Sequence, residues 1–267
     1  MINLHERLSE YSYGYGVTRE TQGLLESVGL RPTPFLPNLL HEADLGFDVG
    51  FKDQGKVVVL QFKLGHELKR FHRSQPAQPI PLLSRPFWRF DVDTTAHQFQ
   101  RLEEFEASGA DTYYVAPKFS SWWEFDRAFQ NDEILERSLL QKPSEITAAI
   151  ATTGGSPGHH RVVYDRSRQH VCSEPAALKA RNSQEFAREI SESIEKAGVT
   201  LEQSLEMLFE RDGSVAGPGR LNAARRDQIM GRFKSREIAM AAVVGVEAWS
   251  QGAQIIYVTN PSSDQAD

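Results

Sequence analysis

The segment Leu45–Lys63, with the sequence LGFDVGFKDQGKVVVLQFK, constrains the fold of this chain more than any other segment. Its four consecutive aliphatic residues, Val57–Leu60, predict a buried strand. The polar run Lys52–Lys56 ahead of them contains a glycine and predicts a tight turn. Since apolar residues stand on both sides of that turn, the segment predicts a β-hairpin whose second strand is fully buried.

Polar side chains follow this buried strand and also precede the turn. Successive side chains point to opposite faces of a strand, so Gln61 and Lys63 are expected on one face and Phe62 on the other. Asp48 ends the first strand of the predicted hairpin. A carboxylate, an amide oxygen and an ammonium group would then lie close together in the sheet. Burying such groups is costly, which makes them candidates for a functional site.

Composition sets the class of protein and excludes several functions. The chain has 267 residues, 40% of them hydrophobic and 10% aromatic, which is typical of a globular protein with a real core. Its net charge of −6 excludes a uniformly basic nucleic-acid coat, so a polyanion would need a local patch. Cys172 is its one cysteine, which excludes an internal disulfide and indicates a reducing compartment. No signal peptide and no apolar run of about 18 residues is present, so we expect a cytoplasmic protein that does not enter membranes.

The rest of the chain predicts alternating helices and strands. Helices are expected, from apolar periodicity and capping residues, at residues 18–29, Asn38–Ala43, His97–Ala107, Ser120–Gln130, Ser183–Ala197, Leu201–Phe209 and Asn222–Ser250. Further strands are expected at Pro86–Val92, Thr112–Ala116, Arg161–Tyr164, Gln169–Cys172 and Gln254–Thr259. The proline-rich residues 31–37 predict a connector, and residues 131–182 are less regular apart from their two strands. Trp122 and Trp123 are expected in the core, in preference to a base-stacking platform.

One stretch of this acidic chain is clearly basic. Residues 64–85 predict a long irregular loop because they contain several prolines. Between residues 64 and 89 a single acid, Glu67, stands among five basic side chains: Lys69, Arg70, Arg73, Arg85 and Arg89. Two interpretations stay open, a solvated loop that happens to be basic and a surface that contacts phosphates.

Other motifs in the chain do not predict a site. Residues 50–57 match most of a P-loop, but they lack its Ser/Thr and stand between two predicted strands. The histidines and the cysteine between residues 159 and 172 lack the spacing of a zinc site.

The arrangement Asp48, then Gln61-x-Lys63 in the next strand, resembles the motif of the PD-(D/E)XK, or restriction-endonuclease-like, nuclease superfamily. Glu42 stands where many of these enzymes carry an additional acid. The helix containing Gln98 and the strand after it are similar to the end of the family's αβββαβ core. The resemblance covers roughly residues 35–130 and extends to nuclease-like proteins of bacterial anti-phage defence.

The resemblance implies a site and a reaction. Asp48, Glu42 and the Gln61 oxygen would ligate Mg²⁺, with Mn²⁺ as an alternative, because hard cations prefer oxygen donors. Lys63 would orient the attacking water or offset developing charge. DNA would contact Gln98 and the five basic residues between residues 64 and 89. Gln61 departs from the usual acid, although glutamine variants occur in active Mrr-type nucleases.

Two functions therefore remain as hypotheses. The first is a metal-dependent DNA endonuclease, an effector of a bacterial anti-phage defence system. The second is a catalytically inactive nuclease-fold subunit that binds nucleic acid or assembles with a partner protein of the same system. A plain hairpin with an exposed Asp48 and a Lys63 that reaches into solvent would carry neither function.

We expect an α/β fold with a mixed sheet, in which residues 1–180 form the nuclease-like domain and residues 181–267 a mostly helical C-terminal extension. That extension ends in a short strand and can pack on the same core. The apolar run Met240–Val246 favours burial against the protein's own core over a docking face. A homo-oligomer, or a complex with a partner protein, is nevertheless expected from the helical region 183–250.

Overall fold

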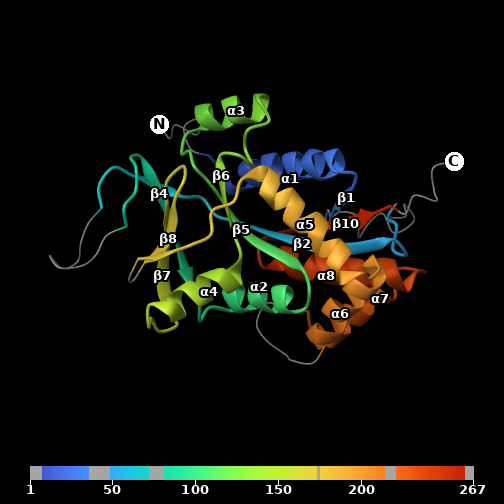
Figure 1. Cartoon of the computed structure of the whole chain (residues 1–267). Helices are drawn as coiled ribbons and strands as arrows, with labels where there is room; N and C mark the ends of the chain where they lie inside the picture. Colours follow the sequence, from blue (N-terminus) through green and yellow to red (C-terminus); the bar gives the residue numbers. More distant parts are fainter. Residues whose placement is uncertain (1–7, 36–48, 72–80, 173–174, 214–220, 262–267) are drawn as a thin grey trace, which may run out of the picture. The chain divides into compact units, whose positions relative to one another are not determined.

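The computed structural model describes residues 8–35, 49–71, 81–172, 175–213 and 221–261 (Figure 1). Within these ranges the chain is mixed α/β, with eight helices and two five-stranded sheets. The predicted helix Asn38–Ala43, the first strand of the predicted hairpin up to Asp48, and residues 262–267 lie outside the described residues. None of the described helices is long and apolar enough to cross a membrane.

The chain forms two compact units that alternate along the sequence. The first unit contains residues 1–20, 62–103 and 113–186, and the second contains residues 21–61, 104–112 and 187–267. The C-terminal part thus belongs to one unit with residues near the N-terminus. This division differs from the expected boundary at residue 180, because the last strand returns to the strand of the candidate motif.

That strand is β2 (Gln54–Phe62), and it pairs antiparallel with β10 (Ala253–Asn260), which pairs in turn with β1 (Arg31–Pro34). The sheet has the order β1-β10-β2-β5-β6. Residues Val57–Leu60 are fully buried, as the aliphatic run predicts. The neighbours of β2 in the sheet are β10 and β5, whereas the sequence predicted the strand just ahead of the turn.

A second expectation is wrong: residues 31–37 were expected to form a connector because of their prolines, but Arg31–Pro34 form strand β1. The strand lies at the edge of the sheet. Proline lacks an N–H donor, and an edge strand tolerates this loss because one of its sides needs no ladder partner. Sequence patterning could not show that β10 would supply the other side.

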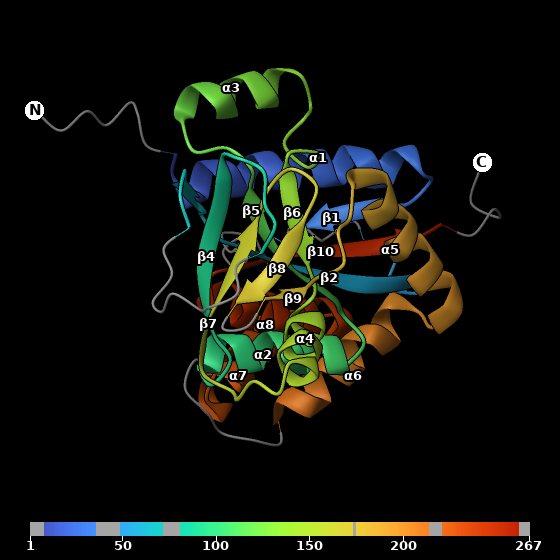
Figure 2. The ribbon, with the colours of Figure 1, turned by 60° about the vertical axis from the view of Figure 1, so that its left-hand side comes forward.

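Strand β5 (Asp111–Pro117) begins in the second unit and ends in the first, where it pairs with β6 (Ser138–Gln141). The other sheet belongs wholly to the first unit and contains β3 (His66–Leu68), β4 (Phe87–Asp93), β7 (His159–Tyr164), β8 (Gln169–Cys172) and β9 (Ala176–Ala177). Its strands are antiparallel and lie side by side in Figure 2. The predicted β7–β8 hairpin is confirmed. Strands β3, β6 and β9 were missed because runs of two to four residues carry no periodicity.

The helices α1 (Glu10–Ser27), α2 (His97–Ala107), α3 (Trp122–Gln130) and α4 (Pro143–Thr152) precede the C-terminal part. Helix α1 begins eight residues before the predicted start at Thr18. Its first turns contain Gly14, which disfavours a helix. A Cβ at Gly14 would lie 2.6 Å from the ring of Phe62, so this glycine is needed for close packing of the helix on that ring.

The C-terminal helices are α5 (Ser183–Ala197), α6 (Leu201–Gly213), α7 (Ala223–Met230) and α8 (Arg236–Ser250). Both predicted capping boxes are present, Asn182 with Glu185 and Thr200 with Gln203. The predicted long helix is instead two helices, α7 and α8, because the second starts anew with Ser235 as its N-cap.

Helix α8 packs against strand β10 in its own unit. Its residues Met240–Gly245 are buried, and the Tyr257 hydroxyl donates to the Ala241 carbonyl at 2.5 Å. A Cβ at Gly245 would lie 2.7 Å from the Phe35 ring, so the helix approaches that ring too closely for any larger residue. Burial of the apolar run in the protein's own core is therefore confirmed.

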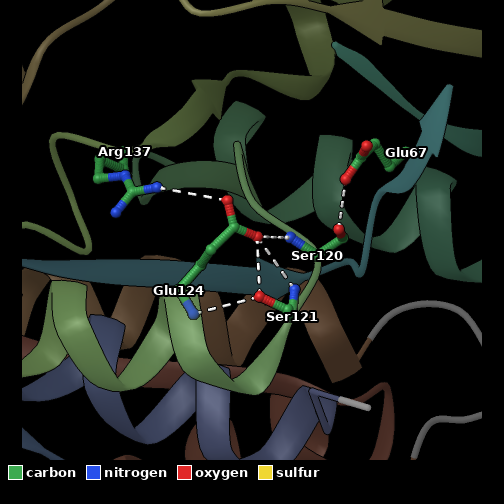
Figure 3. A network of polar contacts seen from close by, with 5 residues as sticks. All are labelled: Glu67, Ser120, Ser121, Glu124 and Arg137. Carbon is green, nitrogen blue, oxygen red and sulfur yellow. Dashed lines mark hydrogen bonds and ion pairs between the residues drawn. The ribbon is translucent and has the colours of Figure 1, made fainter. Parts of the chain in front are cut away.

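Helix α3 starts with a capping box (Figure 3). The Ser121 hydroxyl accepts from the Glu124 backbone N–H at 3.2 Å, and the Glu124 carboxylate accepts from the backbone N–H groups of Ser120 and Ser121. Burial alone would raise the pKa of Glu124, but these hydrogen bonds and nearby Arg137 outweigh it and lower that pKa.

The expectation that Trp122 and Trp123 belong to the core is wrong, since both side chains are exposed. The cap fixes where α3 begins and hence which side faces inward. Phe125 and Ala128, three residues apart, form the buried side. Trp122 contacts the Phe125 ring from the first turn of the helix yet remains 42% exposed, and Trp123 is 67% exposed.

We predict that Ser121→Ala lowers the free energy of unfolding by about 1 kcal/mol, because it removes the acceptor for the first turn of α3. Urea denaturation measures this loss. Ser27→Ala is the matched control, since its exposed hydroxyl donates only to the Leu24 carbonyl, and we expect a change within about 0.5 kcal/mol. Equal stability of wild type and Ser121→Ala would contradict a stabilising cap.

Candidate functional site

Lys63 directly follows strand β2 and belongs to the first unit. The chain passes from the second unit to the first between Gln61 and Phe62. The Phe62 ring meets the Tyr13 ring edge-on at 6.1 Å, and the Lys63 backbone N–H donates to the Val115 carbonyl of β5 at 3.0 Å. The packing of Phe62 and the backbone hydrogen bond of Lys63 thus fix the direction of the Lys63 side chain.

The Lys63 side chain is half-buried. Its Nζ donates to Oε1 of Gln98 on α2 at 2.8 Å and lies 5.9 Å from the centre of the Tyr114 ring. Burial lowers the pKa of Lys63, and the Glu10 carboxylate partly opposes that effect. Gln98, predicted to contact nucleic acid, therefore positions this lysine.

Glu10 is the site residue that the sequence did not reveal. It is the first residue of α1, and burial of its carboxyl raises its pKa while Lys63 lowers it. Its partner is more than 50 residues away in the chain, so no local motif links them. The available signal was Ser9, whose hydroxyl accepts from the Ser12 N–H as a capping serine does and marks the true start of the helix.

Gln61 lies at the end of β2 within the second unit and is 1% exposed. Its Nε2 donates to the Gly252 carbonyl at 3.1 Å. Gly252 has a φ of +77°, which favours glycine, and it forms the turn between α8 and β10. The amide of Gln61 is thus anchored to that turn, and this anchoring fixes the direction of its oxygen.

Three of the predicted site residues, Asp48, Glu42 and Arg73, lie outside the described residues. Within the described ranges, no group of three or more His, Cys, Asp or Glu side chains is placed to hold a metal ion. The metal prediction depends on the carboxylates of Asp48 and Glu42, which are oxygen ligands of the kind Mg²⁺ prefers.

No known protein family, curated protein or solved structure matches this chain. A function for this chain is therefore inferred from the chemistry of its own residues.

The remaining basic candidates belong to the first unit, as does Lys63. Lys69 and Arg70 follow β3 and are exposed, and Arg85 is exposed just before β4. Arg89 is half-buried within β4, opposite His66 and Val163 in the sheet register. Lys69, Arg70 and Arg85 are thus available to a polyanion, whereas Arg89 is partly enclosed by the sheet.

We predict that Gln61→Glu lowers the free energy of unfolding by about 3 kcal/mol. The substitution replaces a buried N–H donor by a carboxylate oxygen that faces the Gly252 carbonyl. Denaturant midpoints measure the loss. Gln54→Glu makes the same change at the exposed first residue of β2 and should cost much less. Similar losses in both variants would show that the anchoring of Gln61 contributes little.

We also predict that Lys63 makes the free energy of unfolding depend on pH. Its folded pKa is below its unfolded value of 10.5, so between these two values the unfolded chain binds more protons and stability rises with pH. Lys63→Met removes this contribution. The stability of wild type relative to Lys63→Met should therefore increase as pH rises from neutral toward 10.5, in chemical denaturation at each pH. A pH-independent difference would contradict the desolvation of Lys63.

Proposed function

We propose that this protein is a metal-dependent endonuclease that hydrolyses DNA phosphodiester bonds, built on a restriction-endonuclease-like core. The observation that carries the proposal is the environment of Lys63, which is half-buried, donates to Gln98 and interacts electrostatically with the Glu10 carboxylate. A lysine that served only solubility at a strand end would extend into water. Retaining a buried ammonium group costs stability, and such groups cluster at functional sites.

The chemistry of phosphodiester hydrolysis suits such a lysine. Negative charge develops on the oxygens of the phosphate as water attacks, and an ammonium group stabilises that charge more strongly in a partly dry site than in water. Lys63 has three N–H donors, so it can bind Gln98 and a phosphate oxygen or the attacking water at the same time. Gln98 positions the group, and Glu10 favours its charged form.

The proposal assigns the metal to residues ahead of Lys63. Asp48 and Glu42 would hold Mg²⁺ or Mn²⁺ with the Gln61 oxygen, and the ion would lower the pKa of a bound water and neutralise phosphate charge. The exposed Lys69, Arg70 and Arg85 would bind the phosphates of the DNA backbone. An effector role in bacterial anti-phage defence remains part of this proposal through the resemblance of the motif.

We predict that Lys63→Ala reduces cleavage of supercoiled plasmid DNA, in the presence of Mg²⁺ or Mn²⁺, by at least about 100-fold, because a group acting only on transition-state charge is lost. Lys118→Ala is the matched control. Lys118 is also a half-buried lysine whose pKa is lowered by burial, but its Nζ donates to the Arg166 carbonyl. We expect Lys118→Ala to cleave at close to the wild-type rate.

Two outcomes would contradict the proposal. The first is cleavage that survives Lys63→Ala, and the second is the absence of cleavage by wild type with either metal. Circular dichroism of both variants confirms that a lost activity is not a lost fold.

One observation favours a second function. Gln61 is buried and its amide is anchored to the Gly252 carbonyl, an arrangement that also suits a purely structural glutamine. The chain would then be an inactive nuclease-fold subunit that binds nucleic acid or a partner protein. A mobility-shift assay across a salt series distinguishes the two. DNA binding by wild type that needs no metal, without any cleavage, supports the subunit.

A further inference from the structure

Four large aromatic side chains of the first unit are exposed on two helices. On α1, Tyr11 is 88% and Tyr15 61% exposed, and on α3, Trp122 is 42% and Trp123 67% exposed. We call these four residues the aromatic surface. Single exposed apolar residues are ordinary, whereas a group of aromatic rings on neighbouring elements indicates a binding surface.

The two helices are in direct contact, and Tyr15 and Trp122 are joined through the rings of Phe129 and Phe125. Tyr15 on α1 stacks on Phe129 of α3, with ring centres 6.1 Å apart. A Cβ at Gly16 would lie 3.2 Å from the Phe125 ring of α3, which shows how closely the helices approach. Figure 2 shows α3 alongside α1. Trp122 packs one side of its ring against Phe125, at 5.1 Å between centres, and remains partly open to solvent.

Arginines accompany these rings. The Arg127 guanidinium lies 5.8 Å from the centre of the Trp123 ring, and that of Arg19 lies 4.4 Å from the centre of Phe129. Acids are also present, since Arg19 pairs with Asp132 at 3.0 Å and Asp126 is exposed on α3. The surface thus combines flat rings and guanidinium groups, the two side-chain types on which nucleobases stack.

The aromatic surface is connected to the proposed site within the same unit. The Ser120 hydroxyl, next to the N-cap of α3, donates to the Glu67 carboxylate of β3 at 2.5 Å (Figure 3). Lys69 and Arg70 follow that strand and are exposed. On the other helix, Tyr11 comes directly after Glu10, which acts on Lys63. Two exposed cationic side chains thus follow, by two and three residues, the glutamate that the start of α3 contacts.

We propose that the aromatic surface binds the unpaired bases of a single-stranded segment of the substrate, while Lys69 and Arg70 bind its phosphates. This inference rests on the proposed function and specifies the substrate as nucleic acid with a single-stranded portion. Trp, Tyr and Arg are also typical of protein–protein hot spots. The contact of Ser120 with Glu67, two residues before the exposed Lys69, and the Arg127 guanidinium over Trp123 favour nucleic acid over a protein partner.

The test is binding of a fluorescein-labelled oligothymidylate of roughly 20 nucleotides, long enough for one such site, in EDTA to prevent cleavage. Anisotropy gives the affinity of the full-length protein. Trp122→Ala with Trp123→Ala should weaken binding at least tenfold, because base–aromatic stacking is lost, while the salt dependence from phosphate contacts stays similar. Trp249→Ala is the matched control, since this tryptophan is also exposed but lies on α8, and we expect a change within about twofold.

Equal affinity of wild type and the double variant overturns this inference, as does the absence of binding by wild type. If the double variant binds DNA as wild type does but has a smaller mass by light scattering, the surface instead holds a second copy of the chain. The plasmid assay keeps the two proposals separate. If Lys63→Ala abolishes cleavage and the double variant binds oligothymidylate normally, the nuclease proposal stands and the aromatic surface has another role.

Discussion

The protein keeps the ammonium group of Lys63 partly out of water, where its charged form is disfavoured. A desolvated lysine needs hydrogen-bond acceptors and a nearby negative charge, and Lys63 has both in Gln98 and Glu10. These partners come from the helix after the motif and from the first helix of the chain. The Phe62–Tyr13 contact and the hydrogen bond from the Lys63 backbone N–H to Val115 position Lys63 relative to these partners. The position of the lysine is thus a consequence of tertiary packing as much as of its own strand.

The parts of the fold with strong local signals could be predicted from the sequence. The aliphatic run of β2, the helix His97–Ala107 and the capping boxes at Asn182 and Thr200 are all where their patterns place them. In each case the deciding interaction lies within a few residues, as a cap or a periodic face. The short strands and the start of α1 could not be predicted, because the interactions that decide them are distant in the sequence. Gly14 is unfavourable in a helix by itself, and only the ring of Phe62 against it explains its presence.

The candidate site was predictable in part for the same reason. Lys63 could be found because its motif is local, and Gln98 because it stands in the helix expected after the motif. Its role as the acceptor for Lys63 depends on how α2 packs, which periodicity does not specify. Glu10 had no local signal. The exposure of Trp122 and Trp123 was missed because hydrophobicity alone suggested burial, while the cap at Ser121 sets the phase of the helix.

The most direct measurement is the pKa of Lys63 itself, followed by NMR of the lysine side chains with ¹³C at Cε and assigned through a Lys63→Arg variant. We expect a pKa below 10.5 in wild type, because burial disfavours the charged form. We expect a still lower pKa in Glu10→Gln, because the Glu10 carboxylate raises the pKa of Lys63. A pKa of 10.5 or above that does not respond to Glu10→Gln would contradict the claim that this lysine is a desolvated, positioned group.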